Sequence, residues 1–327
     1  MYQLPYSVIL TNVGHCCDRY LSTGYSDPFA LEELFERVSS IEGVQAVELI
    51  ASCLNSPEDV ARVKENLHRT GLELSAIIPD HFGKQIWGKG AFTAEDPSVR
   101  AAAVSHTRKM MDILVELGGD VVSLWPGQDG YDYHFQADYL QKHNWFVEGI
   151  RQCCDYRPEV RVALEYKPKE PRNRCFLSNV SSTLLMIQEI QRPNCGVTID
   201  FGHALVAYEN VAESVALLSL HGNTLFHLHM NDNYGYWDDD MITGSVHTIS
   251  YLEFLYWLKK TNYQGWLSMD QYPYREDGKR AVNESLRWLD GLTNVMNRMD
   301  ADEVERVIHS GDATESSALL RKYLFAK

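Results

Sequence analysis

The chain has 327 residues, of which 45% are hydrophobic and 23% charged, as expected for a globular protein with a large core. Its 45 acidic and 30 basic residues give a formal net charge of −15, which disfavours binding to nucleic acids or to anionic membranes. The sequence shows neither a signal peptide nor a long apolar run that could span a membrane. Seven scattered cysteines without a CxxC pair indicate free thiols, so we expect a cytoplasmic protein.

Eight short apolar segments recur along the chain and are typical of β-strands. They span residues 6–10, 44–50, 73–78, 120–125, 161–167, 196–200, 225–230 and 266–270. Stretches with helical periodicity separate them, and this alternation predicts a parallel sheet. Eight such units favour a closed (β/α)8 barrel, the TIM barrel, over an open sheet. No GxGxxG motif follows the first strand, which argues against a dinucleotide-binding fold.

The chain contains no linker rich in proline, glycine or serine, so we predict a single barrel domain over residues 1–299. Residues 300–327 form two amphipathic stretches beyond the eighth unit. We expect them to be a short C-terminal helical extension that packs on the barrel or on a neighbouring subunit.

Polar residues gather at the ends of the predicted strands, where the active sites of such barrels lie. Glu165, Asp200, His229 and Asp270 are expected to meet there, from four consecutive strands. Three half-buried carboxylates would be very costly without a counter-charge. Oxygen ligands with an imidazole suit Mn²⁺ or Mg²⁺, with Co²⁺ also suitable. The adjacent His227, deeper on the same strand face, is predicted to be a hydrogen-bonded core residue.

Three consecutive aspartates follow the seventh strand, at positions 238–240. In an extended loop Asp238 and Asp240 point to the same side, so with His203 and a bridging Asp200 they would hold a second cation. Asp239 points the other way, and we expect it to face solvent or a basic partner.

These motifs resemble those of the xylose isomerase-like barrels, particularly xylose isomerase and L-rhamnose isomerase. The resemblance covers most of the chain and rests on five segments. They are residues 90–133, EYKPKEPR (165–172), DFGHA (200–204), HMNDNYGYWDDD (229–240) and MDQ (269–271). His229 and Asp200 match the rhamnose-type enzymes, whereas xylose isomerases carry aspartate and glutamate there. The first-strand segment NVGHCCDRY does not reproduce the tryptophan-bearing loop of xylose isomerase.

The resemblance implies a metal-dependent aldose–ketose isomerase that acts on a free sugar, with two divalent cations per subunit. Lys167 would stabilise a developing alkoxide, unless it serves only as a salt-bridge partner of Glu170 or Asp129. His81 would open the sugar ring, with Asp80 as a candidate to orient it, and Trp125 would form a hydrophobic wall for the sugar. Hydrogen would move between C1 and C2, by hydride shift or through an enediol. Family members are commonly homodimers or homotetramers.

Three alternatives remain open. A ketose 3-epimerase could use the same scaffold, with one cation and two opposed glutamates, although the eighth strand ends in Asp270. A metal-dependent apurinic DNA endonuclease shares the barrel, but it requires more histidine ligands and a basic groove. A non-catalytic sugar-binding barrel would have no reason to assemble two cation sites around a lysine.

Overall fold

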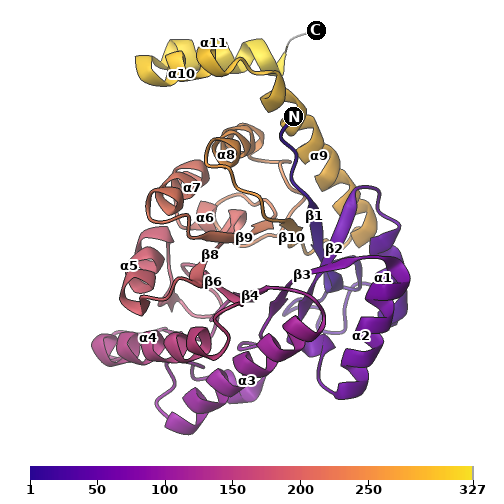
Figure 1. The fold of residues 1–327 in the computed structure, drawn as a ribbon, viewed down its shortest axis with the longest axis vertical. Helices are drawn as coiled ribbons and strands as arrows, with labels where there is room; N and C mark the ends of the chain where they lie inside the picture. Colours follow the sequence, from indigo (N-terminus) through magenta and orange to yellow (C-terminus); the bar gives the residue numbers. More distant parts are fainter. Residues whose placement is uncertain (326–327) are drawn as a thin grey trace.

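The computed structural model describes residues 1–325 and confirms the predicted (β/α)8 barrel, whose strands close into a ring surrounded by helices (Figure 1). The barrel strands are β1 (Tyr6–Ile9), β2 (Val44–Ile50), β3 (Glu73–Ile78), β4 (Val121–Leu124), β6 (Arg161–Glu165), β8 (Cys195–Asp200), β9 (Leu225–Met230) and β10 (Leu267–Met269). They are all parallel, and β1 closes the ring by pairing with β10. The predicted fifth strand extends to residue 167, but β6 ends at Glu165.

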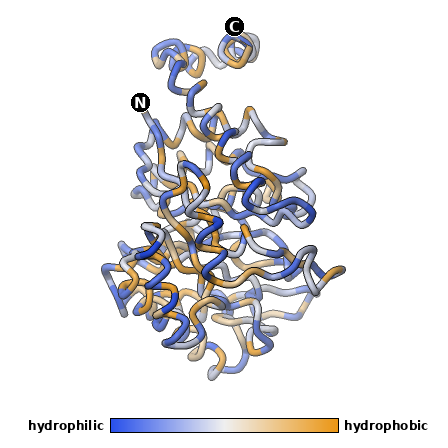
Figure 2. Tube along the Cα trace, turned by 90° about the vertical axis from the view of Figure 1, so that its right-hand side faces the viewer, coloured by the Kyte–Doolittle hydropathy of each residue, from blue (hydrophilic) through white to orange (hydrophobic). Residues whose placement is uncertain are grey.

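Helices form the outer layer of the barrel. They are α1 (Leu31–Ser39), α2 (Pro57–Thr70), α3 (Pro97–Glu116), α4 (Tyr139–Tyr156), α5 (Val180–Ile190), α6 (Phe201–Val206), α7 (Val211–Leu220), α8 (Thr248–Lys260) and α9 (Gly278–Arg298). Local sequence sets their ends, as α2 shows: Ser56 caps its N-terminus together with Asp59, and Gly71 ends it at φ +71°. Hydrophobic stretches concentrate toward the middle of the molecule (Figure 2).

Several short elements lie at the end of the barrel where the strands' carboxyl termini are. Three 3₁₀ turns follow β1, β2 and β3: η1 (Leu10–Val13), η2 (Ala51–Cys53) and η3 (Gln85–Trp87). A small antiparallel ribbon joins β5 (Gly130–Tyr131) to β7 (Arg174–Cys175), and so ties the loop after β4 to the loop after β6. Both loops carry residues of the predicted site, which the ribbon therefore helps to hold in place.

Two further helices, α10 (Ala301–Ser310) and α11 (Ala313–Leu324), project beyond α9 at one side of the barrel (Figure 1). They pack on each other through a small cluster of Val304, Val307 and Leu319. This cluster also contacts Tyr256 of α8, and the Tyr256 hydroxyl bonds the Glu305 carboxylate. The two helices therefore rest on α8 and α9 rather than near the centre of the barrel.

The lower part of the barrel interior is filled by hydrogen-bonded polar side chains as well as by apolar ones. The Ser7 and Ser75 hydroxyls lie 2.6 Å apart, and the Ser123 and Thr198 hydroxyls 2.8 Å apart. Each pair satisfies its own buried polar atoms. These hydroxyl pairs fill space inside the barrel, and the polar residues predicted for the site lie at the end where the strands' carboxyl termini are. None of the helices within residues 1–325 combines the length and the apolar character needed to cross a membrane.

Candidate metal centre and active site

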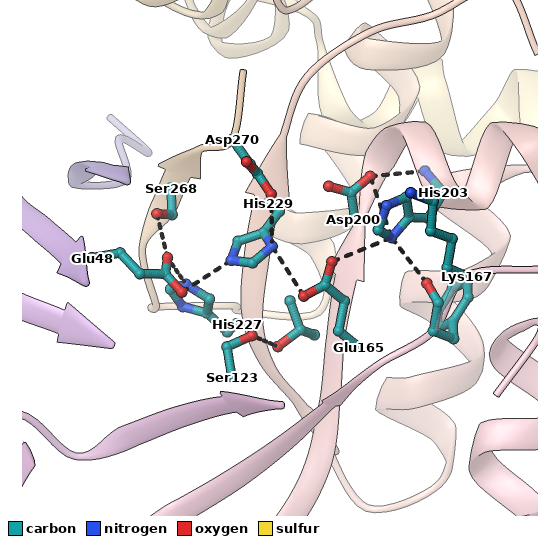
Figure 3. Close-up of polar contacts among 12 residues, drawn as sticks. Glu48, Ser123, Glu165, Lys167, Asp200, His203, His227, His229, Ser268 and Asp270 are labelled. Atoms are coloured by element: carbon teal, nitrogen blue, oxygen red, sulfur yellow. Dashed lines mark hydrogen bonds and ion pairs between the residues drawn. The ribbon is translucent and has the colours of Figure 1, made fainter. Parts of the chain in front are cut away.

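The structure brings Glu165, Asp200, His229 and Asp270 together at the carboxyl ends of four neighbouring strands (Figure 3). One potential ligand atom from each of the four lies within 4.8 Å of those of the others. The His229 Nδ1 atom is 3.3 Å from Glu165 Oε2 and 3.5 Å from Asp270 Oδ2. That nitrogen is buried without a hydrogen-bond partner. We call these four residues the first donor group.

The electrostatics of the first donor group favour a cation. Burial, assisted by neighbouring carboxylates, raises the pKa of Asp200 to about 6 and that of Asp270 to about 7. These carboxylates thus hold a proton more strongly than usual, because they are buried with too little positive charge around them. A divalent cation would supply that charge, and the unpartnered His229 Nδ1 would supply a nitrogen ligand. The residues therefore fit such an ion.

A second donor group consists of Asp200, His203 and Asp238, whose ligand atoms also lie within 4.8 Å of one another. Asp200 caps α6, and its Oδ1 accepts the His203 backbone N–H at 2.8 Å. The His203 Nδ1 lies 3.1 Å from the Tyr166 carbonyl oxygen, which leaves Nε2 facing Asp238 Oδ2 at 3.0 Å. The imidazole is therefore held in place on one side and presents a nitrogen to the second group on the other.

Lys167 lies against the second donor group. Its Nζ is 2.7 Å from Asp238 Oδ2 and 2.9 Å from Glu170 Oε2, and it lies 5.1 Å from the centre of the Trp125 ring. The nearby carboxylates of Asp238 and Glu170 raise the pKa of this buried amine despite its desolvation. Lys167 is thus a fixed cation. It does pair with Glu170, whereas Asp129 instead accepts bonds from the backbone of residues 91–93.

Asp240 lies beside both groups, although it is not among the three residues of the second one. The Asn231 side-chain amide links the carboxylates of Asp200 and Asp240. It donates to Asp200 Oδ2 at 2.8 Å and to Asp240 Oδ1 at 3.3 Å. Burial, and next the Asp238 carboxylate, raise the pKa of Asp240 well above its ordinary value. Asp239 is half-buried, and one of its carboxylate oxygens lies 3.4 Å from the Tyr234 backbone nitrogen.

A cavity of about 350 Å³ opens onto both donor groups, and we call it the inner cavity. Its polar wall includes Glu165, Lys167, His203, Asp238, Asp240 and Asp270. Its apolar wall includes Ile9, Ile50, Ile78, Phe82, Trp125 and Tyr272. The Phe82 and Trp125 rings pack at 4.7 Å between centroids, so they form one continuous surface. Trp125 and Lys167 are therefore placed where a substrate could contact them.

The structure does not bring His81 to the inner cavity, which corrects the prediction of a substrate-facing His81. Its side chain is completely buried, with Nε2 3.2 Å from the Ala103 carbonyl oxygen of α3. Its ring packs edge-on against Trp87 and Phe92, and burial lowers its pKa to about 3. Phe82, the next residue, lines the cavity instead. Asp80 accepts the Gly83 backbone N–H and has no hydrogen bond to His81 within the described part of the chain.

Glu48 in the middle of β2 is a component of the site that the sequence analysis missed. Its carboxylate is completely buried and lies 2.9 Å from His227 Nε2, 3.1 Å from His229 Nε2 and 2.6 Å from Ser268 Oγ (Figure 3). The two histidines hold the pKa of Glu48 below its ordinary value against the effect of burial. A His229 proton on Nε2 would bond Glu48 and leave Nδ1 free to bind a metal.

Two asparagines near the donor groups were also missed. The Asn12 side-chain amide donates to Asp270 Oδ1 at 3.2 Å, and Asn231 bridges Asp200 and Asp240 as described above. Both amides orient carboxylates of the candidate site. Only Asn231 had a signal in the sequence, since it follows the seventh strand directly.

The same family emerges when the sequence is compared with known proteins. A family model described as a xylose isomerase-like TIM barrel matches residues 35–292. Xylose isomerase from Thermus thermophilus is 30% identical over 229 residues, which is 68% of this chain and 59% of that protein. Xylose isomerase from Thermus caldophilus is 29% identical over a region of the same coverage. The chain belongs to the xylose isomerase-like TIM barrel family, and the match spans 59% of the length of these two relatives.

Solved structures share the fold at lower identity. A D-tagatose 3-epimerase-like protein superposes with a TM-score of 0.68 at 21% identity, over 89% of this chain and 99% of that one. An L-ribulose 3-epimerase has a TM-score of 0.71 at 13% identity, over 90% and 96%. A xylose isomerase domain protein from Alicyclobacillus acidocaldarius subsp. acidocaldarius has a TM-score of 0.68 at 17% identity, over 90% and 100%.

Proposed function

We propose that this protein is a divalent-metal-dependent aldose–ketose isomerase that acts on a free sugar. The observation that carries the proposal is the pair of donor groups that share Asp200, with the Lys167 ammonium against the second group. A barrel that only bound sugar would have no need for a buried cation beside two adjoining sets of metal-binding side chains. Membership of the xylose isomerase-like family supports the same class of reaction.

The proposal includes two cations, one at each donor group, and Mn²⁺ or Mg²⁺ would suit these ligands, with Co²⁺ also suitable. Glu165, Asp200, His229 and Asp270 would hold the first. Asp200, His203 and Asp238 would hold the second, which Asp240 would complete from the cavity wall. When bound, the cations would polarise neighbouring carbonyl and hydroxyl oxygens of the sugar.

The chain's own side chains position the sugar and stabilise charge. The Trp125 and Phe82 rings offer an apolar wall against one face of the sugar, which orients it toward the donor groups. Lys167 Nζ can donate a hydrogen bond to the oxygen that gains negative charge as hydrogen moves between C1 and C2. Asp238 and Glu170 keep that nitrogen charged and in place. His81, buried behind the wall, has no part in this proposal.

A ketose 3-epimerase remains the second candidate, because several solved structures with the same fold are named as 3-epimerases. The first donor group would suffice for its single cation. The side chain at position 270 is an aspartate, however, whose Oδ2 lies 3.5 Å from His229 Nδ1. This short carboxylate is part of the ligand group and is a poor match for a second glutamate that reaches toward C3 of a substrate.

A panel of free aldoses and ketoses, incubated with the Mn²⁺-loaded protein and followed by ¹³C NMR, tests the proposal. We expect interconversion of one aldose with its ketose and about two cations per chain. Inversion at C3 with a single cation per chain would establish the epimerase instead. No conversion of any sugar, before or after metal loading, would refute both. Lys167→Met tests the lysine separately from the cations: this variant should retain the cations and lose conversion.

A further inference from the structure

A second cavity, with a volume of about 640 Å³, adjoins the inner cavity at the mouth of the barrel. We call it the outer cavity. The residues that border both cavities are Glu170, Trp237, Asp238, Asp240, Tyr272 and Tyr274. These six residues line both cavities, so the two cavities meet there. A ligand held at the donor groups could therefore extend from one cavity into the other.

The volumes indicate that one sugar unit does not use all of this space. Small-molecule sites in proteins usually measure about 300–1,000 Å³. The inner cavity, at about 350 Å³, is at the small end of that range and suits a single monosaccharide. The outer cavity is larger, and nothing in the proposed isomerisation requires it.

The outer wall combines aromatic rings with hydrogen-bonding groups. Tyr20, Trp237, Tyr272 and Tyr274 supply the rings, and the Tyr272 and Tyr274 centroids lie 6.2 Å apart. The Arg19 guanidinium lies 4.9 Å from the centre of the Tyr20 ring and 5.9 Å from that of Trp237. A sugar presents apolar C–H faces and hydroxyl edges, so rings bordered by polar groups suit it.

The unpaired polar side chains and the net charge of the outer cavity restrict the chemical class of ligand that it can bind. In the described part of the chain, the side chains of Arg275 and Glu276 form no hydrogen bond, so both are free to meet hydroxyl groups. Apart from Asp238 and Asp240, whose charge the proposed second cation would offset, the lining carries two arginines, Arg19 and Arg275, and four acidic side chains, those of Asp18, Glu170, Asp239 and Glu276. A phosphate or carboxylate substituent would be repelled there, whereas a neutral glycosyl unit would not.

We propose that the outer cavity is a binding subsite for a neutral glycosyl unit, attached to the end of the sugar remote from the donor groups. The substrates are then reducing disaccharides or longer saccharides, whose C1 and C2 lie at the donor groups. This inference rests on the proposed function, because that function determines which end of the sugar faces the donor groups.

Isothermal titration calorimetry on the Mn²⁺-loaded protein tests the subsite through binding rather than turnover. The probes are glucose with its 4-linked and 6-linked glucosyl disaccharides, and xylose with xylobiose. We expect at least one disaccharide to bind about 10-fold more tightly than its reducing monosaccharide. Tyr20→Ala should weaken that disaccharide about 2- to 10-fold and leave the monosaccharide unchanged.

Tyr236→Ala is the matched control. Tyr20 and Tyr236 are both 79% exposed, but only Tyr20 lines the outer cavity. Equal affinity for each disaccharide and its monosaccharide would overturn the subsite, as would equal effects of the two variants. So would a change of sedimentation coefficient in Tyr20→Ala with sugar affinity intact, since a second copy of the chain would then cover this face.

The outcomes separate the subsite from the proposed function. Conversion of monosaccharides without any preference for disaccharides would overturn the subsite and leave the isomerase standing. A preference for disaccharides that Tyr20→Ala removes, with no conversion of any sugar, would support the subsite and refute the isomerase. Absence of binding by any of the probes would overturn the subsite.

Discussion

At the residue scale, Glu48 contacts both buried histidines of β9. Its carboxylate contacts Nε2 of His229, while Nδ1 of the same ring faces the first donor group. Glu48→Gln replaces the carboxylate with a neutral amide. The amide N–H groups would then face the His227, His229 and Ser268 side chains, which themselves donate hydrogen bonds to Glu48. We expect the Kd for Mn²⁺ to rise about 10- to 100-fold, as for other residues that orient metal-binding histidines.

Calorimetric titration of the metal-free variant with Mn²⁺ measures this change. Ser268→Ala is the control, because it removes a different hydrogen-bond partner of Glu48 and keeps the charge. If Glu48→Gln binds Mn²⁺ as tightly as the unaltered protein, Glu48 does not orient His229 for metal binding.

Asp240→Asn tests the proposed second cation site separately. Asp240 lines the inner cavity but is not part of the first donor group. We therefore expect loss of turnover, with one cation per chain retained, as counted by elemental analysis after gel filtration. His229→Ala should instead remove a ligand of the first group. Full turnover in Asp240→Asn would exclude Asp240 from the reaction.

Residues at strand ends could be predicted from the sequence, because alternation along a strand and the common direction of all strands place them. Glu165 and Asp200 are examples. Glu48 could not be predicted, since its partner His229 is 181 residues away and meets it only after the barrel closes. His81 was misplaced because the alternation of side chains stops where β3 ends at Ile78. Beyond that point the loop, not the strand, decides which residue faces the cavity.

At the scale of elements, the start of α6 packs so closely on the loop after β9 that any side chain at position 202 would force a neighbour to shift. A Cβ atom on Gly202 would lie 2.2 Å from Asn231 Oδ1 and 2.7 Å from Asn233 Nδ2. Gly202→Ala should displace Asn231, which bridges Asp200 and Asp240. We expect a loss of about 1–3 kcal/mol in the free energy of unfolding, measured by urea denaturation, together with weaker binding of Mn²⁺.

Gly291→Ala is the matched control for that variant. Gly291 lies within α9, and a Cβ atom there would have no neighbour within 4 Å. The same change should stabilise the protein by about 0.5–1 kcal/mol, because alanine favours the helix. If the two variants were equally stable, close packing at Gly202 would not be what holds the loop.

The regularity of the strands explains why the fold was predictable at this scale. Each barrel strand is a short apolar run between helical stretches, and the eight predicted runs all appear as strands. The ribbon of β5 and β7 was not predicted, because strands of two residues carry no periodic pattern. Its pairing depends on two loops that come together only in the folded barrel.

At the scale of the whole molecule, the ionised carboxylates of Asp200, Asp240 and Asp270, whose pKa values are raised, oppose folding at neutral pH, and a bound cation would offset this cost. Removal of metal with excess EDTA should therefore lower the Tm. A ligand present at about 100 times its Kd contributes about 2.7 kcal/mol, which corresponds to roughly 4 °C for a chain of 327 residues. Differential scanning fluorimetry measures the shift. His229→Ala, treated in the same way, should show a much smaller change, and an equal shift would place the stabilising ion elsewhere.

Asp200 contributes to both donor groups and also caps α6. If two cations bind as proposed, the occupancy of one would influence the other through this single side chain, and the two affinities would be thermodynamically linked. A titration with Mn²⁺ should therefore deviate from the curve expected for two independent sites. A shift of the Asp200 carboxylate on binding at one group would change the affinity of the other group. The protein would then respond to metal availability over a concentration range that neither group would set alone.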